Sequence, residues 1–179
     1  MKKYSGSQIA LHWLVLLLIV ITYAAMEFKG IFPKNSPGRY WMATAHYSCG
    51  VSVFILMLLV RMVVRLFSPQ PPVVPALPQW QKLSASLMHF ILYCLFIILP
   101  ALGVLSLYFG QKEWSFIFIN MPISAVKNSL LQSSLKDVHE FLANTGYFIV
   151  GLHAAAALMH HYIWRDNTLL RMMPGKHRD

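Results

Sequence analysis

The chain has 179 residues, of which 57% are hydrophobic and 12% are charged, and its mean hydropathy is +0.54. A soluble domain of this length has no interior large enough to hide so much apolar surface, so the composition indicates an integral membrane protein. The formal net charge of +9 does not indicate a nucleic-acid partner, because the basic residues lie at the ends of apolar runs and not in one block.

Four apolar stretches are each long enough to cross a bilayer as a helix, which takes about 20 residues. They cover about residues 9–28, 42–66, 83–109 and 138–164. The first follows Lys2 and Lys3, but ITYAAM lacks a good small-residue cleavage site, so we expect a retained helix and not a signal peptide. We predict an all-α fold, with residues 1–179 forming a single domain of four transmembrane helices.

The connectors differ in character. Residues 68–79 are rich in proline, which predicts an extended link. Residues 110–137 carry several aromatic side chains and have room for a short interfacial helix. Pro100 and Gly103 predict a kink in the third helix. Cys49 and Cys94 are expected to be buried as small hydrophobic residues, and without a CxxC the sequence gives no support for a zinc finger or a thiol redox motif.

The basic residues predict the orientation. Both termini share one side of the membrane with the second connector, and this side carries nine of the 15 basic residues: Lys2, Lys3, Arg61, Arg65, Lys82, Arg165, Arg171, Lys176 and Arg178. The other side carries six: Lys29, Lys34, Arg39, Lys112, Lys127 and Lys136. Since cytoplasmic loops are enriched in Lys and Arg, we expect both termini in the cytoplasm.

Seven of the eight histidines lie in or at the edges of the predicted helices: His12, His46, His89, His139, His153, His160 and His161. Ionisable residues within membrane spans are rare and usually functional. One such histidine alone is explained by a hydrogen bond to a neighbouring helix. A zinc or copper site would require a tighter cluster or Cys and carboxylate ligands.

His139 and His153 are fourteen residues apart on the fourth helix. At about 100° per residue this spacing turns through about 1400°, close to four full turns, so both side chains leave from nearly the same face, about 21 Å apart along the axis. Gly146 lies midway on that face and would leave room for a large flat ligand. The pattern indicates two haems at two depths, each held by one of these histidines.

Partners for these ligands must match them in depth. His46 lies level with His139 near the outer end of the second helix, where Gly50 follows one turn deeper. His12 lies level with His153 near the inner end of the first helix, and His89 on the third helix competes with it. Ligation of each iron by two histidines leaves no open position, which suits electron transfer.

These residues resemble the prokaryotic cytochrome b561 family in the segments LHWL around His12, HYSCG from His46, and HEFLANTGYFIVGLH from His139 to His153. The resemblance covers the whole chain and implies a four-helix bundle in the bacterial inner membrane with two stacked b-type haems. In this family the first, second and fourth helices supply the ligands. That implies an outer pair of His46 and His139 and an inner pair of His12 and His153, and it demotes His89.

The segments KYSGSQIALHWLV, AMEFKGIFP, LANTGYFIVGLHAAAALMHHYIW and DNTLLRMMP resemble in particular the members that act as superoxide:ubiquinone oxidoreductases. This resemblance implies an enzyme that oxidises superoxide to dioxygen and passes the electrons through two haems to ubiquinone. The basic residues of the outer side would then attract the superoxide anion. His160, Trp164 and Arg165 are candidate quinone contacts. Arg61 and Arg65 are either partners of the haem propionates or topology anchors.

Two other functions fit the same sequence. In the first, the chain is an electron-relay subunit between a partner dehydrogenase and the quinone pool, with residues 110–137 as its docking site. In the second, it is a haem-free transporter or structural membrane protein. The first would copurify with a soluble partner and would not react with superoxide. The second would show no haem absorbance.

Overall fold

The structure is a computed structural model that describes residues 2–68 and 70–175. Its main helices are α1 (Gly6–Phe28), α2 (Pro37–Ile55), α3 (Met62–Phe67), α4 (Gln79–Phe109) and α5 (Ser129–Tyr162). A π-helical segment, η2 (Leu56–Arg61), joins α2 to α3, so Pro37–Phe67 forms one rod. Short 3-10 turns follow α1 at η1 (Lys29–Ile31) and α5 at η3 (Leu170–Met172). The strands β1 (Ser115–Phe116) and β2 (Ile119–Asn120) form an antiparallel hairpin.

Four of these helical segments are long and apolar enough to cross a membrane, as the sequence predicted: Gly6–Ile31, Pro37–Phe67, Gln79–Phe109 and Ser129–Tyr162. Each begins before its predicted apolar run, and in α1, α2 and α5 a polar side chain caps the N-terminus. Ser5 forms a capping box with Gln8, and the Ser36 side chain accepts a hydrogen bond from the Arg39 N–H ahead of α2. Asn128 caps α5 in the same way, so the helix begins at Ser129, nine residues before the predicted start of the fourth span at 138.

The segment 110–137 does not contain the separate interfacial helix that we expected. Its second part, from Ser129, is the first turns of α5, and its first part forms the β1–β2 hairpin. The proline-rich connector forms no helix from residue 70 to α4, as predicted, but it bends at Val74 and Pro75. The helix α4 runs without a break through Pro100. Cys49 and Cys94 are free thiols that are only partly buried, so the prediction that both are buried was too strong.

The core of the bundle is thin. A single cluster of buried side chains lies where α1, the α2–α3 rod and α4 meet: Val15, Val53, Met57, Leu95, Phe96 and Leu99. Many large apolar side chains point outward instead; Leu83 and Phe148, for example, are 72% and 80% exposed. A bundle with few buried and many exposed apolar side chains is expected where lipid, and not water, surrounds the helices.

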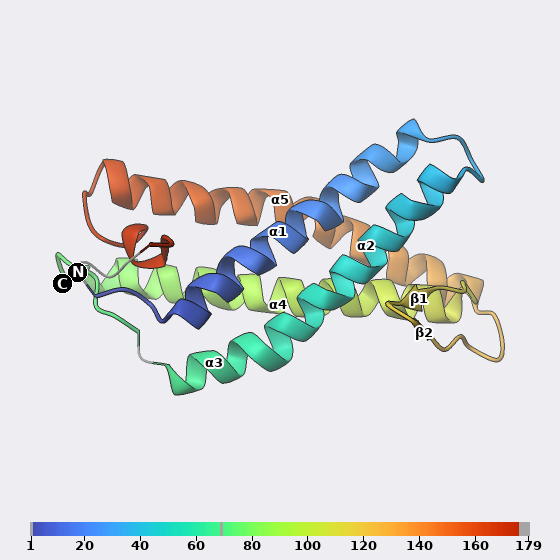
Figure 1. Ribbon diagram of the computed structural model, residues 1–179, viewed down its shortest axis with the longest axis horizontal. Helices are drawn as coiled ribbons and strands as arrows, with labels where there is room; N and C mark the ends of the chain where they lie inside the picture. Colours follow the sequence, from blue (N-terminus) through green and yellow to red (C-terminus); the bar gives the residue numbers. More distant parts are fainter. Residues whose placement is uncertain (1, 69, 176–179) are drawn as a thin grey trace.

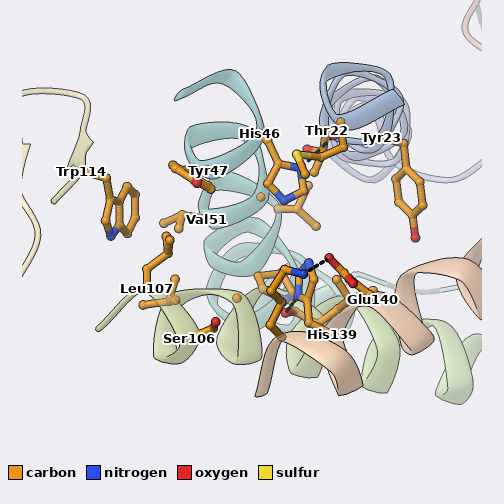
Figure 2. A pocket seen from close by; sticks show the side chains of 18 of the residues that line it. Thr22, Tyr23, His46, Tyr47, Val51, Ser106, Leu107, Trp114, His139 and Glu140 are labelled. Atoms are coloured by element: carbon orange, nitrogen blue, oxygen red, sulfur yellow. Dashed lines mark hydrogen bonds and ion pairs between the residues drawn. The ribbon is translucent and has the colours of Figure 1, made fainter. Parts of the chain in front are cut away.

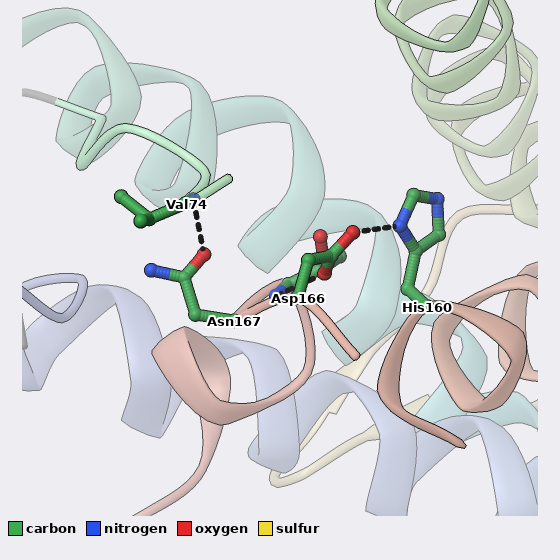
Figure 3. A network of polar contacts seen from close by, with 5 residues as sticks. Val74, His160, Asp166 and Asn167 are labelled. Carbon is green, nitrogen blue, oxygen red and sulfur yellow. Dashed lines mark hydrogen bonds and ion pairs between the residues drawn. The ribbon is translucent and has the colours of Figure 1, made fainter. Parts of the chain in front are cut away.

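Both ends of the described chain lie at the same end of the bundle, which we call the terminal end; the end that carries residues 29–36 and 110–128 is the loop end (Figure 1). The terminal end is held together by the segment after α5. The Tyr4 N–H donates to the Arg171 carbonyl at 3.2 Å, and the Trp13 indole N–H donates to the Met172 carbonyl at 2.9 Å. Asn167 exchanges two hydrogen bonds with Val74 and so fixes the connector between α3 and α4 (Figure 3).

Gly146 does not face open space. A Cβ atom placed there would lie 2.4 Å from the Tyr23 hydroxyl oxygen, and that hydroxyl donates to the Ala143 carbonyl at 3.0 Å. The expectation that this glycine leaves room for a flat ligand was therefore wrong at this depth. The missing side chain instead lets Tyr23 of α1 reach the backbone of α5.

Replacing Gly146 with Ala is expected to destabilise the bundle. The added methyl group would displace the Tyr23 hydroxyl, and such overpacking typically costs about 1–3 kcal/mol. Gly151→Ala is the matched control, because nothing lies within 4 Å of a Cβ there. Thermal unfolding in detergent should show a lower Tm for Gly146→Ala and an unchanged or higher Tm for Gly151→Ala. Equal shifts would show that the Tyr23 contact is not the cause.

Candidate functional site

His46 and His139 face each other at the loop end of the bundle, between α2 and α5 (Figure 2). Their ring centres are 6.1 Å apart and the ring planes are inclined at 80°. Two imidazoles that bind one metal ion, with bonds of about 2.0 Å and ring centres about 1.1 Å beyond each nitrogen, have their centres at most about 6.2 Å apart. The pair predicted from the depth of the two residues thus lies within the range of separations that a shared metal ion allows.

Each of these imidazoles is fixed by a backbone carbonyl of a neighbouring helix. His46 Nδ1 lies 2.9 Å from the Thr22 carbonyl oxygen of α1, and His139 Nδ1 lies 2.8 Å from the Leu99 carbonyl oxygen of α4. A carbonyl only accepts, so both Nδ1 atoms carry the proton and donate it. Nε2 is then the unprotonated nitrogen of each ring, the form that binds a metal.

Two glycines border this pair. A Cβ at Gly103 of α4 would lie 3.1 Å from His139 Cε1, so the absence of a side chain lets the imidazole lie directly on α4. In the sequence Gly103 predicts only a kink, because its contact with His139 depends on how α4 and α5 cross. Gly50, expected to clear space, lines the cavity described next, and a Cβ there would meet only Thr22, at 3.9 Å.

A cavity opens between α1, α2, α4 and α5 around His46 and His139, with an empty volume of about 1030 Å³ including its mouth. Most of its wall is apolar, but Lys29, Lys112 and Lys136 also line it. Lys136 forms an ion pair of 2.9 Å with Glu140, which lines it too. Of the six basic residues predicted on this side, the structure therefore gathers three at the cavity that holds the histidine pair.

The second pair, His12 and His153, lies nearer the terminal end, with ring centres 6.3 Å apart and planes inclined at 65°. This separation also suits two ligands of one metal ion. The ring centre of His89 on α4 lies 5.6 Å from that of His153, which a shared metal ion also allows. His12 and His89 therefore both lie next to His153, in agreement with the prediction that they compete as its partner.

Arg61 distinguishes this pair from the loop-end pair. Its guanidinium donates to His12 Nδ1 at 3.2 Å and to the Tyr93 hydroxyl at 3.2 Å. Arg61 is the last residue of η2, and such π-helical turns are frequent at functional sites. In this arrangement His12 Nδ1 accepts, so binding of a metal through His12 Nε2 requires Arg61 to turn away. Arg61, Arg65, His89 and Tyr93 line a second cavity, with an empty volume of about 540 Å³.

Together these features fit a haem protein. Two imidazole pairs lie at two depths, at separations suited to a shared metal ion, and the loop-end pair also has the required tautomer and an adjoining apolar cavity. No group of three His, Cys, Asp or Glu side chains suited to a metal ion is found within residues 2–68 and 70–175. A haem iron needs only two ligands from the protein, which is the number of imidazoles in each pair.

His160 lies beyond His153, at the terminal end, and Nδ1 of its ring hydrogen-bonds the Asp166 carboxylate (Figure 3). The Trp164 ring packs edge-on against the His160 ring with centres 4.5 Å apart, whereas Arg165 is exposed and His161 packs beside Tyr162. Asp166 is not among the predicted site residues, although a carboxylate six residues after His160 is a usable signal in the sequence. Burial raises the pKa of Asp166, but hydrogen bonds from His160 and Thr168 outweigh it and leave the pKa below its ordinary value.

Comparison with known proteins agrees with this description. A family model described as prokaryotic cytochrome b561 matches residues 3–175. Cytochrome b561 homolog 1 of Escherichia coli (strain K12) is 46% identical over 176 residues, which are 98% of this chain and 99% of that protein. Probable superoxide oxidase CybB of Yersinia pestis is 43% identical over 175 residues, 98% of each chain. Cytochrome b561 homolog 2 of Escherichia coli (strain K12) is 27% identical, covering 96% of this chain and 92% of its own.

The hydrogen bonds of Asp166 predict a stability that depends on pH. Because its pKa is lower in the folded protein, the ionised carboxylate stabilises the fold above the ordinary pKa of 3.8, and this stability is lost as the pH falls through the folded pKa. We expect Asp166→Asn to lower the Tm at pH 7, and the difference from wild type to vanish in acid. A difference that stays constant between pH 7 and pH 3 would contradict this assignment.

Proposed function

The chain belongs to the prokaryotic cytochrome b561 family, whose members are membrane electron-transfer proteins with b-type haem, and from this we propose that it binds two such haems and carries electrons from superoxide to ubiquinone. His46 and His139 hold one haem, and His12 and His153 hold the other. The observation that carries the proposal is the pairing of these imidazoles at two depths, with one pair opening into a cavity lined by lysines.

Superoxide is the substrate that suits this cavity. It is a small anion, and Lys29, Lys112 and Lys136 raise its local concentration beside the loop-end pair. The relative from Yersinia pestis that is named a probable superoxide oxidase matches along nearly the whole chain, which supports the same substrate here. With more basic residues at the terminal end, that end faces the cytoplasm of a bacterial inner membrane and the lysine-lined cavity faces the outside.

The overall reaction balances with two molecules of superoxide for each quinone. Each superoxide loses one electron and leaves as dioxygen, and one ubiquinone gains two electrons and two protons to become ubiquinol. Two bound haems would supply sites that accept and release one electron at a time along the bundle.

His160 and Trp164 form the ubiquinone contact at the terminal end in this proposal. Asp166 holds His160 through Nδ1, which leaves Nε2 to exchange a proton with a quinone oxygen. The exposed Arg165 lies beside the same group of residues.

Haem content tests the ligand assignment. Protein made with ample haem should carry two haems per chain, measured as haem absorbance per mole of protein. Replacing either His46 or His139 with Ala should remove one haem, and replacing either His12 or His153 should remove the other. His89→Ala is the matched control and should keep both, because the proposal gives it no iron. Loss of haem from His89→Ala but not from His12→Ala would assign the ligand to His89 instead.

Reduction by superoxide tests the reaction. Superoxide should reduce the haem bands of the purified protein, and added ubiquinone should reverse this. The rate should fall with ionic strength and in Lys112→Gln and Lys136→Gln, because each change weakens attraction of the anion, whereas Lys82→Gln at the terminal end should match wild type. A rate independent of salt would exclude steering. Intact haem that superoxide does not reduce would favour an electron-relay subunit that serves a partner dehydrogenase.

A further inference from the structure

The hairpin between α4 and α5 has an apolar tip that is largely exposed. Ser115 pairs with Asn120 and Phe116 with Ile119, and the turn consists of Ile117 and Phe118. Ile117, Phe118 and Ile119 are 68%, 96% and 68% exposed. No charged residue occurs between Glu113 and Lys127. A turn that faces water is normally built from Gly, Asn or Asp, so this composition needs another explanation.

The hairpin lies beside the helices and not beyond their ends (Figure 1). The Trp114 ring at its base packs edge-on against Tyr47 of α2, with centres 5.8 Å apart. Tyr47 is ten residues into α2, which places it about 15 Å from the start of that helix. The base of the hairpin therefore packs against the side of α2, well away from the start of that helix.

The bilayer boundary falls at this level. The hydrocarbon core is about 30 Å thick, which corresponds to about 20 helical residues. Taking the exposed Arg65, near the end of the α2–α3 rod, as the terminal-end boundary puts the other boundary at about residue 45. Trp41, four residues before it, is 63% exposed, as expected for an interfacial aromatic residue. By this count Tyr47, and with it the base of the hairpin, lies at the edge of the hydrocarbon.

The turn itself is strained. Ile117 has φ of 57°, in the left-handed region, which is a genuine outlier for a β-branched residue. Glycine or asparagine would adopt this conformation more readily. The sequence therefore places a large apolar side chain where the backbone disfavours one, which indicates that the side chain itself has a contact to make.

We propose that Ile117, Phe118 and Ile119 insert into the lipid leaflet at the loop end, so that the hairpin is a membrane-anchored wall of the cavity. Trp114 and Lys112, which precede the inserted tip, line that cavity together with His46. The leaflet thereby holds one wall of the cavity in place. The proposal depends on the hairpin and the bundle alone and stands or falls separately from haem binding and from superoxide as the substrate.

Accessibility of a spin label tests it directly. A nitroxide is attached at Phe118→Cys in the full chain with Cys49 and Cys94 replaced by Ala, reconstituted in phospholipid nanodiscs. Insertion predicts strong relaxation by dissolved oxygen and weak relaxation by a water-soluble nickel chelate. The same label at Lys127→Cys is the matched control on the same loop and should show the reverse.

Two outcomes would overturn the proposal. Strong relaxation of the label at position 118 by the nickel chelate would put the tip in water. Protection from both reagents would mean that protein covers it, from a partner or a second copy of the chain.

A second measurement covers the case in which the label disturbs the turn. Phe118→Asp should expel the tip from the leaflet and expose the loop, so trypsin should cleave after Lys112 and Lys127 several-fold faster than in wild type. Phe118→Leu keeps an apolar tip and should be cleaved at the wild-type rate. Equal cleavage of the two variants would exclude anchoring by this side chain.

Discussion

The hydrogen bond between an imidazole Nδ1–H and a backbone carbonyl of the next helix is the interaction on which the loop-end site depends. Inside lipid, a polar ring without a partner is costly, and a carbonyl already used within its own helix accepts a second hydrogen bond at little expense. His46 and His139 each use this bond, to Thr22 and Leu99. It ties α2 to α1 and α5 to α4, and it leaves the second nitrogen of each ring facing the cavity.

The terminal-end cluster is built on a different principle. There a guanidinium donates to His12, and three imidazoles converge from α1, α4 and α5. Backbone carbonyls thus hold both histidines of the loop-end pair, whereas at the terminal end His12 accepts from a charged guanidinium.

Much of this arrangement could be predicted from the sequence because it follows from helical geometry. Four apolar runs fixed the number of spans, and the fourteen-residue spacing of His139 and His153 placed two side chains on one face at two depths. What could not be predicted depends on contacts between helices. Tyr23 packs against Gly146, His139 lies against Gly103, and Arg61 donates to His12. These contacts depend on how the helices cross, and the spacing of residues along one helix does not predict them. The β1–β2 hairpin was missed because two-residue strands are too short to leave a pattern.

The hydrogen bonds that close the terminal end have a consequence for the order of biosynthesis. Tyr4 and Trp13 find their partners at Arg171 and Met172, and the second pair is 159 residues apart in the chain. Because a ribosome makes Tyr4 and Trp13 long before their partners, α1 has to wait in the membrane until α5 and the segment after it have been made. Only then do the hydrogen bonds that close the terminal end form.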